Sequence, residues 1–475
     1  MAKIKFGTDG WRAIIGEDFT FENVRIVTQA IADFINSQKS SIYGKKKVLV
    51  GYDTRFLSDK FAEAIACVLA ANGMKVILSD NACSTPAVSF YIKNNKLTGG
   101  VMVTASHNPA AYNGIKYKGF FGGSAGTDII EKIEKKLHKN PVKTMGIEEA
   151  REKKKVVCKD ITKEQIDFIR KYADMKALKK KRFKVLVDSM NGVGGTYLRD
   201  MLKGTNIRVD FINAERNPGF RGIAPEPKLQ NLKELIKRVK SGKYDLGVAT
   251  DGDADRVAIV DEKGNLLSGH KLMALLLLHL HENRGMRGGV VQTICGTVLI
   301  NKICEKYGIK MHETPVGFKY ICELMTKEDI LIGGEETGGI GFKDYIPERD
   351  SFLSAMLVME LMANWKESLS EVVDDVDKEY GKFVYARNDC VFPEEKRKKL
   401  LAGMKKDPLK SILNKKVVDI KDYDGTKFIC EDGSWMLLRL SGTEPKLRIY
   451  SETNSKKKTE KYALIGKKYA FRLMK

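Results

Sequence analysis

Short apolar runs rich in β-branched residues alternate with amphipathic stretches along most of this chain. Such alternation is typical of parallel sheets covered by helices, so the predicted fold class is α/β. In the clearest unit, a predicted strand at 47–52 precedes a helix at 59–72, and a second strand follows at 75–78. The same order returns in later segments: a strand at 183–188 with a helix at 191–202, a strand at 246–250, and a strand at 289–293 with a helix at 298–307.

The chain has 475 residues, which is too many for one hydrophobic core and indicates roughly three or four domains. Charged stretches poor in strands near 140–155 and 374–381, and a break near 261–264, mark the predicted boundaries. The C-terminal part differs from the rest, because several of its predicted strands follow one another closely. We expect three similar α/β domains with mixed, mostly parallel sheets, followed by a C-terminal α+β domain: 1–145, 156–260, 261–375 and 380–475.

Lysine and arginine (83) outnumber aspartate and glutamate (61), which gives a formal net charge of +22. A field of that sign attracts phosphorylated ligands, nucleic acid or anionic lipid. Much of the excess lies in short runs typical of solvated surface, such as 45–47 and 456–458. No aromatic-rich nucleic-acid module accompanies these runs, so we expect no nucleic-acid partner.

The sequence starts without a secretory signal, and its longest apolar run, 272–278, is far shorter than the ~20 residues of a membrane helix. We therefore expect a cytoplasmic protein without a membrane partner, and a buried helix at 272–278. The eight cysteines include no Cys-x-x-Cys pair, so neither a zinc ribbon nor a dense disulfide framework is indicated.

The strongest local pattern is Asp251-Gly-Asp253-Ala-Asp255-Arg256, directly after the predicted strand at 246–250. Three carboxylates at alternate positions in a turn can converge on a hard divalent cation such as Mg²⁺ or Ca²⁺. A calcium helix-loop-helix would have glycine where Arg256 stands and a helix before the loop, so Mg²⁺ is favoured. The alternative is an acidic turn that only caps a sheet edge.

A second pattern, Thr104-Ala-Ser106-His107-Asn108-Pro109, follows a predicted strand at 100–103. The carboxyl ends of parallel strands line the crevice where open α/β sheets bind ligands, so Ser106 is a candidate nucleophile. His107 can shuttle a proton beside it, although no Gly-x-Ser-x-Gly elbow surrounds the serine. In isolation this pattern suits a plain turn equally well.

Two further loops carry polar groups. The glycine-flanked loop 333–339 contains Glu335 and Thr337, whose acid and hydroxyl groups suit the hydroxyls of a sugar. The segment Arg439-Leu-Ser441-Gly442-Thr443-Glu444-Pro445, with Arg448 beyond it, suits a phosphate because arginine, hydroxyls and backbone amides can saturate its oxygens. Each loop alone is explained as well by a glycine turn or a basic surface turn.

Two other patterns do not indicate a site. Gly192, Gly194 and Gly195 have the wrong spacing for a dinucleotide fingerprint and predict a tight strand-to-helix turn. His279 and His281 have no acid or cysteine cluster beside them in the sequence, so we interpret them as packing or surface histidines. Together, the candidate nucleophile, metal site, sugar loop and phosphate loop make a set suited to phosphoryl transfer.

In this order, the patterns resemble those of the α-D-phosphohexomutases, which include phosphoglucomutases, phosphomannomutases and phosphoglucosamine mutases. The resemblance spans the chain from Phe6-Gly7-Thr8-Asp9-Gly10-Trp11-Arg12 to the segment 439–448. It implies four domains around a central active-site cleft. It also implies an isomerase that interconverts hexose 1-phosphate and hexose 6-phosphate through a phosphoserine and a hexose 1,6-bisphosphate. The expected partner is a small phosphosugar, and the expected state is a monomer or homodimer.

The resemblance also implies a role for each candidate residue. Ser106 would carry the phosphoryl group and hold Mg²⁺ together with Asp251, Asp253 and Asp255. Lys116 matches the family's general acid/base, and a lysine can serve in this role when neighbouring cations lower its pKa. Arg12 and His107 would assist near the serine. The implied substrate-binding residues are Arg256, Glu335, Thr337 and Arg349. The residues implied to grip the non-reacting phosphate are Arg439, Ser441, Gly442, Thr443 and Arg448.

The loop Glu335-Glu-Thr-Gly-Gly339 indicates which sugar is preferred. In many dual-specificity phosphomannomutases and phosphoglucosamine mutases the corresponding loop ends in a histidine, which this chain lacks. It looks more like the phosphoglucomutase loop, so glucose is expected, with mannose, glucosamine or pentose phosphates as alternatives. A non-catalytic phosphosugar-binding protein is disfavoured, because a binder needs no nucleophile, general base and metal site together. A phosphatase is disfavoured because a separate phosphate loop retains a two-ended substrate.

Overall fold

The computed structural model describes residues 4–7, 9–441 and 445–474. The chain folds as two units, one formed by 1–288 with 317–372 and the other by 289–316 with 373–475. Both units combine sheets with helices, as predicted for the α/β class.

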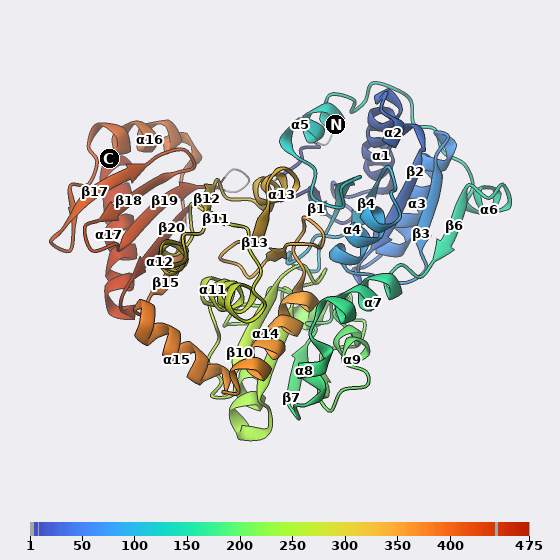
Figure 1. Ribbon diagram of the computed structural model, residues 1–475. Helices are drawn as coiled ribbons and strands as arrows, with labels where there is room; N and C mark the ends of the chain where they lie inside the picture. The colour runs from blue at the N-terminus through green and yellow to red at the C-terminus, as the bar shows by residue number, and fades with distance from the viewer. Residues whose placement is uncertain (1–3, 8, 442–444, 475) are drawn as a thin grey trace. The chain divides into compact units, whose positions relative to one another are not determined.

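The first unit begins with a six-stranded sheet in the order β1-β5-β4-β2-β3-β6 (Figure 1). Its strands are β1 (Trp11–Ile14), β2 (Lys47–Tyr52), β3 (Lys75–Ser79), β4 (Gly99–Val103), β5 (Tyr112–Gly119) and β6 (Val156–Lys159). Strands β2, β3, β4 and β6 are parallel, whereas β5 is antiparallel to β4 and β1. Strand β6 lies beyond residue 145, where we expected the first domain to end, because Val156 packs into the core of this sheet.

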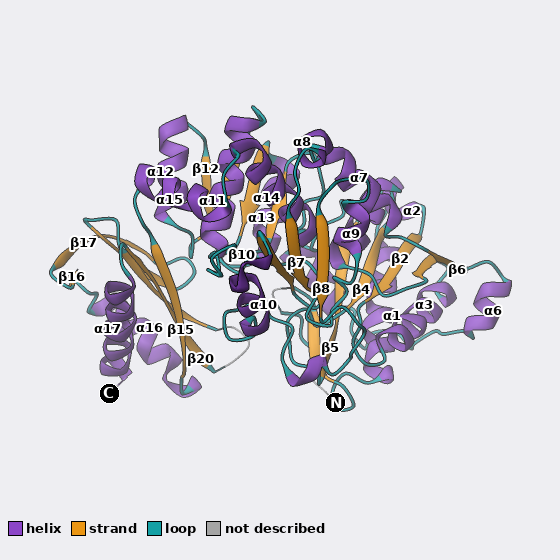
Figure 2. Cartoon of the chain, turned by 90° about the horizontal axis from the view of Figure 1, so that it is seen from below, coloured by secondary structure: helices purple, strands orange, loops and turns teal. Residues whose placement is uncertain are grey.

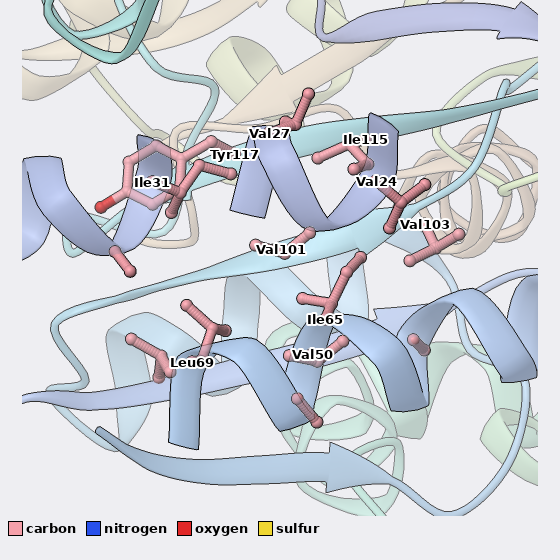
Figure 3. Packing of buried hydrophobic residues seen from close by; sticks show 14 of the residues in the cluster. Val24, Val27, Ile31, Val50, Ile65, Leu69, Val101, Val103, Ile115 and Tyr117 are labelled. Atoms are coloured by element: carbon pink, nitrogen blue, oxygen red, sulfur yellow. The ribbon is translucent and has the colours of Figure 1, made fainter. Parts of the chain in front are cut away.

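Helices cover this sheet: α1 (Phe21–Ser37), α2 (Ser41–Gly44), α3 (Ser58–Ala71), α4 (Thr85–Asn94), α5 (Thr127–Glu134) and α6 (Ile147–Glu152). Three of them begin at hydroxyl caps, where Thr20 accepts from the Asn23 amide, Ser40 from the Tyr43 amide and Ser84 from the Ala87 amide. Figure 3 shows the resulting core, in which aliphatic side chains of α1 and α3 meet those of β2, β4 and β5. The labelled residues are Val24, Val27, Ile31, Val50, Ile65, Leu69, Val101, Val103, Ile115 and Tyr117.

A second sheet of the same unit has the order β10-β9-β7-β8. Its strands are β7 (Lys184–Asp188), β8 (Arg208–Ile212), β9 (Leu246–Thr250) and β10 (Val257–Asp261), with helices α7 (Lys163–Tyr172), α8 (Met175–Lys179), α9 (Tyr197–Met201) and α10 (Lys233–Arg238). Strand β7 is parallel to β8 and β9, and β10 is antiparallel to β9. The helix expected at 191–202 is shorter than predicted, because left-handed φ angles at Met190 (48°), Asn191 (58°) and Gly195 (36°) turn the chain before α9.

The remainder of the first unit contains α11 (Gly269–Leu278), α13 (Phe318–Lys327), β13 (Ile330–Gly334), β14 (Ile340–Phe342) and α14 (Ser351–Trp365). The apolar run 272–278 lies in α11 and is buried throughout, as predicted. Strands β13 and β14 form an antiparallel pair. Among the described residues, none of the helices combines the length and the apolar character that a bilayer crossing demands.

In the second unit, β11 (Gly289–Thr293) and β12 (Met311–Thr314) are parallel and flank α12 (Val298–Tyr307) in sequence. Helix α15 (Leu369–Tyr380) leads to an antiparallel sheet in the order β15-β20-β19-β18-β17-β16. Its strands are β15 (Val384–Val391), β16 (Ser411–Ile412), β17 (Lys415–Lys421), β18 (Thr426–Cys430), β19 (Trp435–Leu440) and β20 (Lys446–Thr453). Helices α16 (Arg397–Lys406) and α17 (Lys456–Met474) pack on this sheet (Figure 2), which confirms the expected change to α+β.

A buried polar network ties α14 to the region after α11. Glu360 is 1 % exposed, lies 3.0 Å from His279 Nε2, and accepts hydrogen bonds from Arg284 Nε (2.6 Å) and the Asp174 amide (2.8 Å). His279 is therefore a packing histidine, as expected, although its acidic partner is distant in sequence. Burial alone would raise the pKa of Glu360, but the hydrogen bonds from His279 and Arg284 outweigh it and lower the pKa to about 2.

This network predicts a pH-dependent loss of stability in Glu360→Gln. Since the folded pKa lies below the unfolded value of ~4.3, the ionised carboxylate stabilises the fold above that pH and its contribution disappears as pH falls towards 2. We expect the substitution to lower the free energy of unfolding by about 3 kcal/mol at pH 7 and by progressively less below about pH 5, measured by urea denaturation. Glu148→Gln, which removes an exposed helix pair with Arg151, should change it by less than about 0.5 kcal/mol. Equal losses at pH 7 and pH 3 would contradict this account of Glu360.

Candidate active site

Ser106 lies just beyond the end of β4 and is 1 % exposed. Its φ of 52° is left-handed, a conformation that costs a non-glycine residue roughly 1–2 kcal/mol. The Ser106 amide donates to Thr104 Oγ1 at 2.9 Å, and Ser106 Oγ donates to Asp251 Oδ2 at 3.0 Å. His107 Nδ1 lies 3.3 Å from the same hydroxyl. The candidate nucleophile therefore points directly at the predicted metal loop.

The three aspartates converge in the tight loop between β9 and β10. Asp251, Asp253 and Asp255 have no exposed surface, and each offers a carboxylate oxygen within 4.8 Å of the others. Among the described residues, Asp253 Oδ1 and Asp255 Oδ1 have no hydrogen-bond partner. Because buried carboxylate oxygens are costly without compensation, these atoms fit a hard divalent cation. This set of oxygens can hold a metal ion.

Asp251 and Asp255 differ in the direction of their pKa shifts. Burial, followed by the neighbouring charges of Asp255 and Asp253, raises the pKa of Asp251 well above its usual value. Burial would also raise the pKa of Asp255, but Arg349 and Lys116 outweigh it and lower that pKa. A bound cation would oppose the rise in the pKa of Asp251, because it favours the charged carboxylate.

Lys116, on β5, is 1 % exposed and lies among the carboxylates. Its Nζ is 2.7 Å from Asp253 Oδ2, 3.1 Å from Asp255 Oδ2 and 2.9 Å from Asp9 Oδ2. Burial would lower the pKa of Lys116, but these three carboxylates outweigh it and raise the pKa above its ordinary value. The expectation that neighbouring cations lower this pKa is therefore wrong here, because the nearest charges are negative. Lys116 is a charged ammonium group in this arrangement.

Arg349 connects the metal loop to the glycine-flanked loop. Its Nη2 donates to Asp255 Oδ2 at 2.7 Å and to Asp9 Oδ2 at 2.9 Å, while Nη1 donates to Glu335 Oε2 at 3.4 Å. Burial raises the pKa of Glu335, although the charge of Arg349 opposes it. Thr337 is half-buried in the same loop. The candidate sugar-reading carboxylate thus shares a cation with the metal loop.

Three other predicted residues lie in or near the serine loop, which we define as residues 104–111 between β4 and β5. Arg12 Nη1 donates to Asn108 Oδ1 at 2.7 Å, which joins β1 to that loop. Arg256 Nε lies 3.9 Å from Asp255 Oδ1 and is buried without a hydrogen-bond partner among the described residues. Burial, followed by the charges of Arg256 and Arg12, holds the pKa of His107 well below its usual value. His107 is therefore neutral at pH 7.

Several site residues were not among the sequence-based candidates. Asp9 lies inside the quoted segment 6–12 but was given no role, and it contacts both Lys116 and Arg349. Thr85 Oγ1 donates to Asp253 Oδ2 at 2.5 Å, and buried Lys118 pairs with Glu348, the residue before Arg349. The alternation of residues on β5 would have revealed Lys118, since it lies on the same strand face as Lys116.

The second unit holds the predicted phosphate-binding residues. Arg439 on β19 is paired in register with Arg448 on β20, so the two guanidinium groups share one face of the sheet. Asp424 accepts from Arg439 Nε at 2.9 Å, whereas Arg448 Nε is buried with no hydrogen-bond partner in the part of the chain that is described. Like charges in this position favour an anion between them. Ser441 is buried after β19, and Gly442 and Thr443 lie outside the described residues.

A serine hydroxyl held against a buried cluster of three carboxylates, with lysine and arginine cations around it, is an arrangement suited to metal-assisted phosphoryl transfer. Comparison with known proteins identifies the family. Models of the phosphoglucomutase/phosphomannomutase family match four consecutive parts of the chain: alpha/beta/alpha domain I at 3–143, domain II at 163–264, domain III at 268–380, and the C-terminal domain at 392–464.

Individual relatives agree with these matches. A phosphoglucomutase/phosphomannomutase of Thermococcus kodakarensis is 34 % identical over 97 % of both chains. A phosphoglucosamine/phosphogalactosamine mutase of Sulfurisphaera tokodaii is 33 % identical over 94 % of both chains. The crystal structure of a Thermus thermophilus protein named for phosphomannomutase is 31 % identical, with a TM-score of 0.86 over 98 % of this chain and 99 % of that one.

The chain therefore belongs to the phosphoglucomutase/phosphomannomutase family, within the α-D-phosphohexomutases. It is an enzyme of the mutase class, an intramolecular phosphotransferase that acts on a small-molecule substrate. The predicted family and class of enzyme are thereby confirmed.

Proposed function

We propose that this enzyme interconverts glucose 1-phosphate and glucose 6-phosphate by way of a phosphorylated Ser106 and glucose 1,6-bisphosphate. The observation that carries the proposal is the 3.0 Å contact between Ser106 Oγ and Asp251 Oδ2 inside the buried carboxylate cluster. Asp251, Asp253, Asp255 and a phosphoserine oxygen would hold Mg²⁺, which neutralises charge on the transferring phosphoryl group when bound. The remaining steps rest on the chain's own residues.

In the first transfer, a sugar hydroxyl oxygen forms a bond to phosphorus while the bond between Ser106 Oγ and phosphorus breaks. Lys116 donates a proton to the departing serine oxygen and regains one from the sugar hydroxyl, so protons balance. Glu335, Thr337 and Arg349 orient the sugar hydroxyls, with Arg256 nearby. The bisphosphate then turns over, and its other phosphate returns to Ser106.

The residues proposed to grip the non-reacting phosphate belong to the second unit. Arg439 and Arg448 present two guanidinium groups on one sheet face, which supports bidentate binding of a phosphate. Ser441, Gly442 and Thr443 complete the proposed set. The bisphosphate intermediate can bind in either orientation, because each of its two ends carries a phosphate.

The glucose preference is supported by the lack of space for a side chain at Gly339. A Cβ atom there would lie 2.3 Å from Arg349 Cδ, so the aliphatic part of Arg349 fills the position of a larger loop residue. The histidine carried by many dual-specificity members therefore does not fit beside Arg349 as it lies. The S. tokodaii relative, named for aminosugar phosphates, makes glucosamine 1-phosphate the main alternative substrate.

The function is tested by following glucose 1-phosphate conversion with Mg²⁺ and a trace of glucose 1,6-bisphosphate, with mannose 1-phosphate and glucosamine 1-phosphate in parallel. We expect the highest kcat/KM with glucose 1-phosphate, no turnover after EDTA treatment, and recovery when Mg²⁺ is restored. A higher kcat/KM for another sugar would overturn the glucose assignment. Release of free phosphate without isomerisation would replace the mutase by a phosphatase, and the absence of any turnover would refute the proposed activity.

A further inference from the structure

A buried arginine outside the proposed catalytic set binds the backbone of the serine loop. Arg55 is completely buried, just beyond β2, and its guanidinium donates four hydrogen bonds to carbonyl oxygens. Nη2 contacts Ser106 O at 2.6 Å and Asn108 O at 2.7 Å, while Nη1 contacts Pro109 O at 2.9 Å and Tyr112 O at 3.0 Å. One side chain thus holds the loop from the nucleophile to the start of β5.

A second set of contacts connects the same arginine to the amide side of the nucleophile. Arg55 Nε lies 3.2 Å from Asp53 Oδ2, which accepts a hydrogen bond from Thr104 Oγ1 at 2.6 Å. Thr104 Oγ1 in turn accepts from the Ser106 amide at 2.9 Å. The Ser106 backbone is therefore bound at both its amide and its carbonyl by one connected network.

The conformation that this network holds is strained. Ser106 has a φ of 52°, and persistent strain of this kind requires surroundings that over-determine the backbone. Gly252 also lies close to this carbonyl, since a Cβ atom there would be 2.4 Å from Ser106 O. Without the guanidinium, these four carbonyl oxygens, including the buried oxygen of Ser106, would lose the hydrogen bonds that Arg55 donates, while the strain remained.

We infer that Arg55 is a positioning residue that fixes the serine loop in its strained form and so directs Ser106 Oγ at the metal-binding carboxylates. The inference rests on the proposed function in one respect, that Ser106 is the nucleophile. The planar fork of arginine is required because a lysine ammonium is a point donor with three protons and cannot serve four carbonyls in this geometry. Stacking of the guanidinium 4.9 Å above the Phe220 ring holds its plane.

The test compares Arg55→Lys and Arg55→Met with Arg284→Met, which removes the ion pair of a half-buried arginine with the buried carboxylate of Glu360 in the same unit. We expect both Arg55 variants to lower kcat about 100-fold, the size of effect that a misplaced reacting group produces, while KM stays within about threefold. Arg284→Met should lower the melting temperature by at least as much as Arg55→Lys yet keep kcat within about threefold of the native enzyme.

Hydrogen exchange separates positioning from general destabilisation and does not depend on turnover. The amides of Ser106, Asn108 and Tyr112 are hydrogen-bonded within the loop, so they should be protected in the native protein. We expect at least about tenfold faster exchange of 105–112 in Arg55→Lys and no change there in Arg284→Met.

Native loop protection with native kcat in Arg55→Lys would overturn the inference, since charge alone would then suffice. If Arg55→Met does not fold, Arg55→Lys carries the test. If the native protein proves inactive on every phosphosugar, the proposed function fails, whereas the exchange experiment still decides whether Arg55 holds the loop.

Discussion

Replacing Ser106 with alanine is expected to lower kcat for glucose 1-phosphate conversion by more than about 10⁴-fold, a loss typical of a deleted nucleophile. The substitution removes the hydroxyl that contacts Asp251 and the only acceptor for the phosphoryl group in the proposed cycle. The native enzyme incubated with glucose 1,6-bisphosphate should gain one phosphoryl group, detectable by intact-protein mass spectrometry, and the variant should gain none. Peptide mapping should place the modification at 105–112.

The matched control is Ser89→Ala in α4. Ser89 is also completely buried, and its hydroxyl has no hydrogen-bond partner among the described residues, so its loss should leave both kcat and phosphorylation unchanged. Retention of activity in Ser106→Ala, or phosphorylation of that variant at another serine, would show that the acceptor had been wrongly assigned.

Local sequence patterns were sufficient for those parts of the site whose residues are neighbours in the chain. The aspartates of the metal loop follow an apolar strand at alternate positions, and the structure brings their carboxylates together because Val257 pairs with Thr250 and closes the loop. Ser106 likewise follows a strand whose five residues are all buried. In both cases a strand end predicts where the side chains lie.

Contacts between distant segments could not be predicted in this way. Lys118 and Glu348 are 230 positions apart, and Arg349 and Asp9 are 340 apart, yet both pairs are in contact. Only the tertiary fold determines which charges meet, so the direction of the Lys116 pKa shift was also inaccessible from the sequence. Arg55 was overlooked for a similar reason, since its partners are backbone carbonyls that leave no trace in residue types.

The helix expected at 191–202 begins later than predicted, whereas the tight strand-to-helix turn predicted at Gly192, Gly194 and Gly195 is present. Its apolar spacing suits a helix, but Gly194 packs against Thr250, where a Cβ atom would lie 2.4 Å from the Thr250 hydroxyl. Close approach to β9 therefore takes precedence over helix propensity, and α9 starts only at Tyr197. The resulting turn lies beside the metal loop, because the Val193 amide donates a hydrogen bond to the Gly252 carbonyl at 3.1 Å. The turn therefore helps to position the metal loop.

Lys116→Met is expected to lower kcat about 10³-fold, within the range for removal of a general acid or base. Lys118→Met provides a closely matched comparison, because both lysines are buried on the same face of β5 and both pair with carboxylates. Breaking either buried pair should lower the free energy of unfolding by about 3–5 kcal/mol, measured by urea denaturation. Stability alone therefore cannot separate the two variants.

Activity can separate them, since only Lys116 contacts the metal-loop carboxylates Asp253 and Asp255, while Lys118 contacts Glu348 and Ser124. We expect kcat of Lys118→Met to fall less than about tenfold under conditions where both variants are fully folded. Equal losses of kcat would contradict a specific role of Lys116 in proton transfer. A large loss in Lys116→Met alone would support that role, because the two substitutions remove the same type of side chain from equivalent burial on one strand.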